Sequence, residues 1–92
     1  MNIEWDEKKN QMNIKKHKIC FEHAAYVFTD PLRKEDYDAK HSSSEEDRII
    51  TIGIALERIL FVSFTEPDIE TIHIISARKA NKKERRFYYG HN

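Results

Sequence analysis

Cysteine, glycine, proline and long apolar runs are all scarce in this 92-residue sequence. A single cysteine, Cys20, cannot form an internal disulfide and is typical of a reducing compartment. Two glycines, Gly53 and Gly90, are too few for a loop that cradles a nucleotide phosphate. No apolar run approaches the roughly 20 residues of a membrane-spanning helix, and the acidic N-terminus differs from a signal peptide. We therefore expect one domain, residues 1–92, in the cytoplasm, without a nucleotide cofactor or a membrane segment.

Metal ligands in a recognisable spacing are also missing. One cysteine cannot build a structural zinc site. No two histidines are spaced as an i, i+4 pair, among His17, His23, His41, His73 and His91. We expect neither a metal nor any other cofactor.

Charge is balanced in total but separated along the chain. The sixteen basic and sixteen acidic residues cancel, so net charge does not identify a partner. Basic residues dominate 78–86, where Glu84 is the only acid, and acidic residues dominate 35–47, where Lys40 is the only base. Such separation suits a protein that holds a polyanion at one end. The alternative is that both runs are solvated surface, as runs of like charge often are.

The first half of the chain is typical of a short strand followed by two helices. Alternation over 3–5 predicts the strand. Asp6 is a favourable N-cap for a helix that runs to about His17, although its apolar stripe is weak. Apolar residues with the spacing i, i+3, i+4, i+7 predict the second helix: Phe21, Ala24, Ala25 and Phe28. Asp30-Pro31 should end that helix.

The second half is typical of an antiparallel sheet. After a polar, serine-rich loop over 39–46, apolar and polar residues alternate in three segments: 50–56, 60–65 and 71–75. We expect their apolar residues to share one face, which requires a first hairpin turn with an odd number of residues, such as Glu57-Arg58-Ile59. The second turn is predicted at Glu66-Pro67-Asp68. The opposite face would be a shallow, semi-polar groove that contains Thr51, Gly53, Ser63 and His73.

The chain should close with a helix. Asn81 and Glu84 have the spacing of a capping box, Gly90 is placed to end the helix, and Phe87 and Tyr88 can dock it. The predicted fold is therefore α+β, with a small antiparallel sheet of about four strands packed by two N-terminal helices and one C-terminal helix.

Three residues are candidates for chemistry, each with a structural alternative. His73 lies mid-strand, five residues before Arg78 and Lys79, and a titrating imidazole near fixed positive charge suits cleavage of an RNA phosphodiester. It could equally be a partly exposed histidine with a satisfied hydrogen bond. Arg48 could bind RNA or pair with the acids before it. His17, at a helix end, needs no catalytic role because the helix dipole favours a cation there.

Three segments in one register carry a family resemblance. The first joins Glu4-Trp5-Asp6-Glu7-x-Lys9 to Asn13-x-x-Lys16-His17-x-Ile19-x-Phe21-Glu22-x-Ala24. The second joins Phe28-x-Asp30-Pro31-Leu32 to the stretch from His41 to Arg48. The third is Ile74-Ile75-Ser76-Ala77-Arg78-Lys79-Ala80-Asn81-Lys82-Lys83-Glu84-Arg85-Arg86, followed by Tyr88 or Tyr89. Together they span nearly the whole chain and resemble the BrnT toxins of bacterial type II toxin–antitoxin systems.

The resemblance implies a RelE-like fold and a metal-independent endoribonuclease that cleaves RNA and inhibits translation. It also implies a BrnA-type antitoxin, whose ribbon-helix-helix domain binds operator DNA, in a 2:2 complex. With His73, the residues implied to be catalytic are Arg78, Lys79, Glu84 and Arg85. Those implied to bind RNA are Arg48, Lys82, Lys83, Arg86 and His17.

Two positions depart from the family pattern, because members commonly carry arginine where this chain has Pro67 and His73. His73 could replace an arginine or act as an acid or base, or the activity could be weaker. Two alternatives to an enzyme therefore stay open. One is a non-catalytic, decayed toxin that serves as a co-repressor subunit, and the other is a binding module whose basic helix docks an antitoxin.

Overall fold

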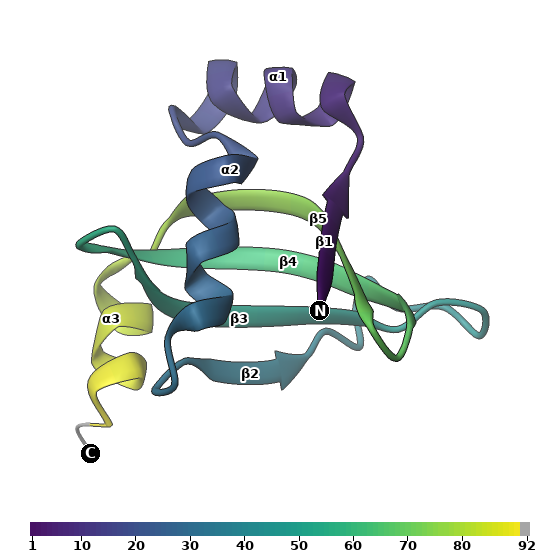
Figure 1. Ribbon diagram of the computed structural model, residues 1–92. Coiled ribbons are helices and arrows are strands. Elements are labelled where there is room, and N and C mark those ends of the chain that lie inside the picture. Colours follow the sequence, from purple (N-terminus) through teal and green to yellow (C-terminus); the bar gives the residue numbers. More distant parts are fainter. Residues whose placement is uncertain (91–92) are drawn as a thin grey trace.

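A computed structural model describes residues 1–90 as a five-stranded sheet with helices on both faces and along one edge (Figure 1). The strands are β1 (Asn2–Trp5), β2 (Lys34–Tyr37), β3 (Arg48–Ala55), β4 (Arg58–Asp68) and β5 (Thr71–Lys79). The helices are α1 (Glu7–His17), α2 (Phe21–Ala24), the 3-10 helix η1 (Ala25–Thr29) and α3 (Lys82–Tyr89). The predicted α+β class is confirmed.

The sheet has the order β1-β5-β4-β3-β2, with β1 parallel to β5 and the other neighbours antiparallel. The sheet is therefore mixed, and it has five strands instead of about four. The sequence did not predict β2, whose four residues are charged or exposed and show no apolar alternation. The segment is a strand because its backbone pairs with β3, and the residues of β2 themselves do not indicate that pairing.

Helix α1 begins and ends as predicted but is anchored by polar contacts. The Asp6 side chain accepts a hydrogen bond from the Lys8 backbone at 2.9 Å, and the helix ends at His17. Buried Asn13 donates to the Ala77 carbonyl at 2.8 Å and accepts from the Ala77 amide at 3.1 Å. These contacts hold α1 along β5, which explains why the helix needs so little apolar surface.

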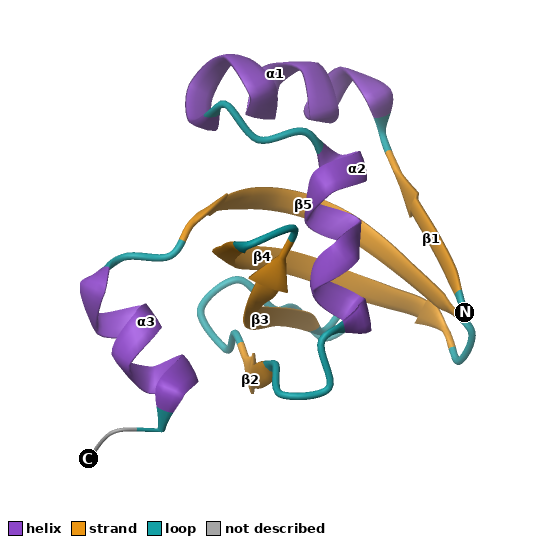
Figure 2. Ribbon diagram, turned by 60° about the vertical axis from the view of Figure 1, so that its left-hand side comes forward, coloured by secondary structure: helices purple, strands orange, loops and turns teal. Residues whose placement is uncertain are grey.

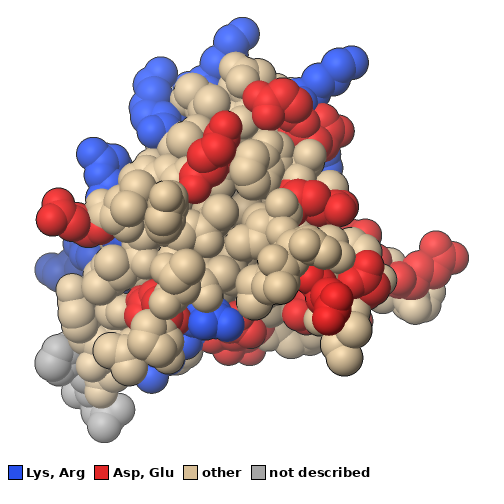
Figure 3. Space-filling view, viewed as in Figure 1, with Lys and Arg blue, Asp and Glu red and all other residues tan. Residues whose placement is uncertain are grey.

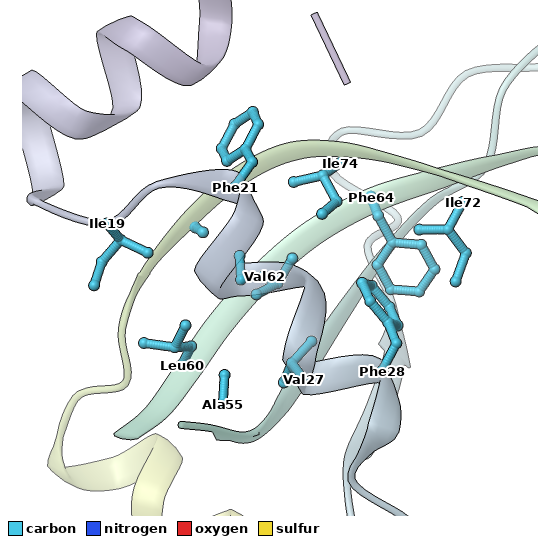
Figure 4. Packing of buried hydrophobic residues seen from close by; sticks show 12 residues of the cluster. Ile19, Phe21, Val27, Phe28, Ala55, Leu60, Val62, Phe64, Ile72 and Ile74 are labelled. Atoms are coloured by element: carbon cyan, nitrogen blue, oxygen red, sulfur yellow. The ribbon is translucent and has the colours of Figure 1, made fainter. Parts of the chain in front are cut away.

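The predicted second helix is α2 continued by η1, and it ends before Pro31 as expected. Figure 1 shows both lying across one face of the sheet. Their Phe21, Val27 and Phe28 side chains are buried against apolar residues of β4 and β5 (Figure 4). The Phe28 and Phe64 rings meet edge to face with centroids 5.0 Å apart. This covered face is the main core.

The prediction for β3 was wrong by one residue in register. The β3–β4 turn contains two residues, Leu56 and Glu57, both with positive φ (50° and 73°). This even-numbered turn places Ile50, Ile52 and Ile54 on the face away from the main core and turns Thr51 and Gly53 into the core. Turns of this kind usually contain Asn-Gly or Asp-Gly, so Leu-Glu gave no signal.

Close packing of η1 accounts for the small residues on β3. A Cβ added at Gly53 would lie 2.8 Å from Val27 Cγ2 and 2.9 Å from Arg33 Cβ. The second turn also differs from the prediction, because β4 continues through Pro67 to Asp68 and the turn falls at 69–70. Pro67 lies in an irregular stretch of the ladder, where a residue without a backbone donor is tolerated.

Helix α3 packs against the opposite face of the sheet, apart from α2 (Figure 2). The Asn81–Glu84 capping box is present, and Gly90 ends the helix with φ of 70°. Tyr88 docks the helix as predicted and is buried beside Ile52, whereas Phe87 is half exposed. Because α3 is short and sits at one end, it covers only part of this face, and we call the remainder the open face.

Candidate active site

Strand register arranges the sheet face that includes the open face in rows. Arg48, Thr65 and His73 form one row across β3, β4 and β5. The next row is Ile50, Ser63 and Ser76, and the third is Ile52, Phe61 and Arg78. A hollow of about 330 Å³ lies over the middle row together with Arg48, Phe61 and Arg78, and its polar or charged lining residues are Asp38, His41, Arg48, Ser63, Ser76 and Arg78. We call it the arginine hollow.

Arg78, at the end of β5, is held on three sides. Its Nη1 and Nη2 atoms donate to the two Glu84 carboxylate oxygens, each at 2.8 Å, and Nη1 also donates to the Lys79 carbonyl at 3.2 Å. The guanidinium carbon lies 4.0 Å above the centre of the Phe61 ring. Guanidinium has five N–H donors in a fixed plane. These bonds use the two donors of Nη1 and one donor of Nη2, so the Nε donor and the second Nη2 donor can still bind another anion.

Glu84 is the electrostatic partner of Arg78. Burial raises the pKa of the Glu84 carboxyl, but hydrogen bonds from Arg78 and the Asn81 backbone, with the Arg78 charge, outweigh it and lower that pKa. In turn, the hydrogen bonds that Arg78 donates to Glu84 raise the pKa of Arg78. Both groups are therefore charged at neutral pH, and Glu84 fixes the plane of the guanidinium.

Arg48 opens β3 and reaches the arginine hollow from the other side. Its Nη2 lies 3.7 Å from a Glu46 oxygen, so the alternative of an ion pair with the preceding acids is present, though long. Among the described residues, the buried Nε of Arg48 has no hydrogen-bond partner. An orphaned buried donor costs free energy, and such groups often mark a site that an ion or ligand completes.

A histidine–carboxylate pair also lines the arginine hollow. His41 Nδ1 lies 2.8 Å from Asp38 Oδ2. From the sequence alone, His41 is only a histidine without a metal-binding spacing and a member of the stretch that carries the family resemblance. The available signal was the Asp-x-x-His spacing just before Arg48, which is visible in the sequence but common in loops.

His73 occupies a different place on the open face. Its Nδ1 lies 2.8 Å from Glu4 Oε2 on β1, so the alternative of a satisfied histidine fits. Five residues of strand separate it from Arg78, roughly 15 Å. His73 does not line the arginine hollow, and neither does Pro67. The two departures from the family pattern therefore fall outside this hollow.

The remaining predicted residues are spread over three locations. Lys79 follows Arg78 directly on β5, so their side chains point to opposite faces. His17 lies on α1, beside an apolar groove with Met12 and Ile75. The cations of α3 are exposed: Lys82, Lys83, Arg85 and Arg86. Arg85 Nη1 donates to the Ala80 carbonyl at 2.8 Å, which stabilises the start of α3.

On the face seen in Figure 3, Lys and Arg side chains lie mainly around α1 and toward α3, and most Asp and Glu side chains lie toward the other side of the view. No group of three or more His, Cys, Asp or Glu side chains within residues 1–90 is placed to hold a metal ion, and His91 lies outside these residues. In the same part of the chain, no helix is long and apolar enough to cross a membrane.

Comparisons with known proteins agree with the predicted family. Residues 5–84 match the family model described as the ribonuclease toxin, BrnT, of type II toxin–antitoxin systems. The crystal structure of the Brucella abortus ribonuclease toxin BrnT is similar, with a TM-score of 0.63, 28% sequence identity, and coverage of 89% of this chain and 99% of that one. None of the curated proteins matches significantly. Because the family model covers most of the chain and the fold agrees, this protein belongs to the BrnT family of ribonuclease toxins.

Proposed function

We propose that this BrnT-family toxin is a metal-independent endoribonuclease that cleaves RNA and thereby inhibits translation. The observation that carries the proposal is the convergence of two arginines, Arg48 and Arg78, on one polar hollow. RNA supplies its own nucleophile, the ribose 2′-OH, so the protein needs only to position the backbone and stabilise charge on the phosphoryl oxygens. Paired guanidinium groups suit that charge.

We assign a distinct role to each proposed residue. Arg78 binds the scissile phosphate through its Nε and Nη2 fork, and Arg48 supplies a second positive charge across the hollow. Glu84 positions Arg78 and does not touch RNA. The exposed cations of α3 then follow the RNA backbone beyond the cut: Lys82, Lys83 and Arg86.

Membership of a type II toxin–antitoxin family implies a protein antitoxin. We propose that it is a BrnA-type protein with a ribbon-helix-helix DNA-binding domain, that the two form a 2:2 complex in the cytoplasm, and that only the antitoxin contacts operator DNA. The alternative of a non-catalytic co-repressor arose because this chain has Pro67 and His73 where family members commonly have arginine. Both positions lie outside the arginine hollow, so we favour the enzyme.

The test is incubation of the purified full-length chain with a labelled single-stranded RNA, with the DNA of the same sequence as the control. We expect RNA to be cut and DNA to remain intact, since DNA lacks the 2′-OH. Addition of EDTA should leave the rate unchanged, and the products should end in 2′,3′-cyclic phosphate. Intact RNA at several-fold molar excess of folded protein would contradict the proposal.

A further inference from the structure

The loop between β2 and β3 presents a histidine to the arginine hollow in a fixed orientation. The His41 side chain is 56% exposed, whereas its partner Asp38 is only 19% exposed. Asp38 also accepts a hydrogen bond from the His41 backbone amide, so one carboxylate holds both the main chain and the ring of His41. The ring is therefore accessible to a ligand, but it is oriented by a group that is mostly shielded.

Further hydrogen bonds hold this loop against the site. The Asp38 amide donates to the Arg48 carbonyl at 2.8 Å. The Ser42 hydroxyl donates to the Asp38 carbonyl at 2.7 Å and accepts from the Arg48 amide at 2.8 Å. The turn that carries His41 is thus tied to the start of β3, beside Arg48. This arrangement brings the imidazole and the guanidinium into the same hollow from one anchored segment.

We propose that His41 is the general base of the ribonuclease reaction and that Asp38 is its positioning residue. This inference rests on the proposed ribonuclease function and names the residue that takes the proton. The sequence pattern favours His73 for proton transfer, but His73 lies outside the arginine hollow.

The ring nitrogens then have separate parts. Asp38 accepts a hydrogen bond from Nδ1–H, which leaves Nε2 with a lone pair for the substrate. Burial acts to raise the pKa of Asp38, but its bonds to His41, with the charges of His41 and Arg48, outweigh it and lower that pKa. The carboxylate is therefore ionised at neutral pH and favours the tautomer with its proton on Nδ1.

The reaction step balances without a metal or an oxidant. His41 Nε2 takes the proton of the ribose 2′-OH, and the 2′ oxygen forms a bond to the adjacent phosphorus. The bond from phosphorus to the 5′ oxygen breaks, and that oxygen takes a proton from water. The hydroxide so formed removes the proton from His41 and restores the base. Arg78 and Arg48 stabilise the negative charge that builds on the phosphoryl oxygens meanwhile.

The structure supplies a competing pair for the test. Glu4 and His73 have the same 2.8 Å carboxylate–Nδ1 geometry as Asp38 and His41 but lie at the β1 edge of the sheet. We would measure RNA cleavage by the full-length chain with His41→Ala, His73→Ala and Asp38→Asn, and monitor folding of each by circular dichroism. His41 is mostly exposed, so its removal should leave the fold intact.

The expected result is a fall in kcat of at least about 100-fold for His41→Ala, the usual size of a lost acid–base group. Free imidazole in the buffer should restore part of that rate, which a purely structural role would not allow. Asp38→Asn should lower kcat with KM little changed, and Asp38→Glu should retain more activity.

Each other outcome is decisive. Cleavage by His41→Ala at the parent rate would overturn the inference and leave the ribonuclease proposal standing. Loss of activity in His73→Ala, with imidazole rescue there and not at position 41, would move the base to His73. Loss in folded His41→Ala without imidazole rescue would assign His41 a structural role and overturn the inference. Intact RNA with the parent chain would end the ribonuclease proposal and this inference with it.

Discussion

The two faces of the sheet are built from alternate residues of the same strands, yet they differ in almost every property. On β4, Phe64 faces α2 and η1 and is 1% exposed, whereas its neighbour Ser63 faces the arginine hollow. The covered face is apolar and closely packed. The open face holds two arginines, one with an orphaned donor and one tied to a carboxylate.

This difference indicates that the two faces of one sheet serve different purposes. Burial of apolar side chains on the covered face supplies most of the folding free energy. The open face keeps polar and charged groups close together, as the proposed binding of an RNA phosphate requires. Substitutions on the two faces should therefore separate stability from activity.

The largest effect on the covered face is expected from Phe64→Ala. It removes a buried ring that contacts Phe28, and such a cavity costs about 3–5 kcal/mol. Urea unfolding should show the loss, while RNA cleavage per folded molecule stays near the parent rate. Phe64→Leu is the milder variant if the first is largely unfolded. A small change in unfolding free energy would show that the core has been placed on the wrong face.

A smaller loss is expected from Gly53→Ala, because the added methyl group would meet Val27 and Arg33 at less than 3 Å. Overpacking of this kind costs about 1–3 kcal/mol. Gly90→Ala is the matched control. Its methyl group would meet no neighbour within 4 Å, so only the left-handed backbone is penalised, by about 1 kcal/mol. Equal or reversed losses by urea unfolding would contradict the close contact of η1 with β3.

The smallest effect concerns Tyr88, which links α3 to the loop after η1. Burial, followed by the hydrogen bond to the Asp30 carboxylate at 2.6 Å, raises the pKa of Tyr88 to about 12 from 10.0. A raised pKa stabilises the fold below pH 10, and that contribution is lost as pH rises from 10 to 12. Tyr88→Phe should lower the free energy of unfolding by about 1 kcal/mol at pH 7. It should also lose less of that free energy than the parent chain between pH 10 and 12. Unfolding at several pH values compares the two, and identical alkaline losses would contradict the assignment.

Elements with local signals were predictable from the sequence. Neighbouring residues determine these features, and the structure has each of them: the helix caps at Asp6 and Asn81, the helix end at Gly90, and the alternation in β4 and β5. Strand β2 was missed because only its partner makes it a strand. The face of β3 was assigned wrongly because a two-residue turn of Leu56 and Glu57 depends on the strands around it.

The site was predictable in composition but not in arrangement. Arg78, Glu84 and Arg48 were named from the charge pattern and the family resemblance, and the structure places all three at or beside the arginine hollow. The presence of Asp38 and His41 beside these residues was not predictable, since both reach the hollow only through the fold of the loop before β3. Lys79 was grouped with Arg78 by sequence adjacency, although adjacent strand residues point apart.

Arg78→Lys tests the division between the two faces most directly, with RNA cleavage and urea unfolding measured on the same preparation. Lysine keeps the charge beside Glu84 but lacks the planar fork that would bind phosphate. Exposed Arg58, at the start of β4, provides the matched control Arg58→Lys. We predict a fall of about 100-fold in cleavage, with unfolding free energy changed by less than about 1 kcal/mol, and neither change in the control. Cleavage at the parent rate by Arg78→Lys would contradict the assignment of the open face as the active site.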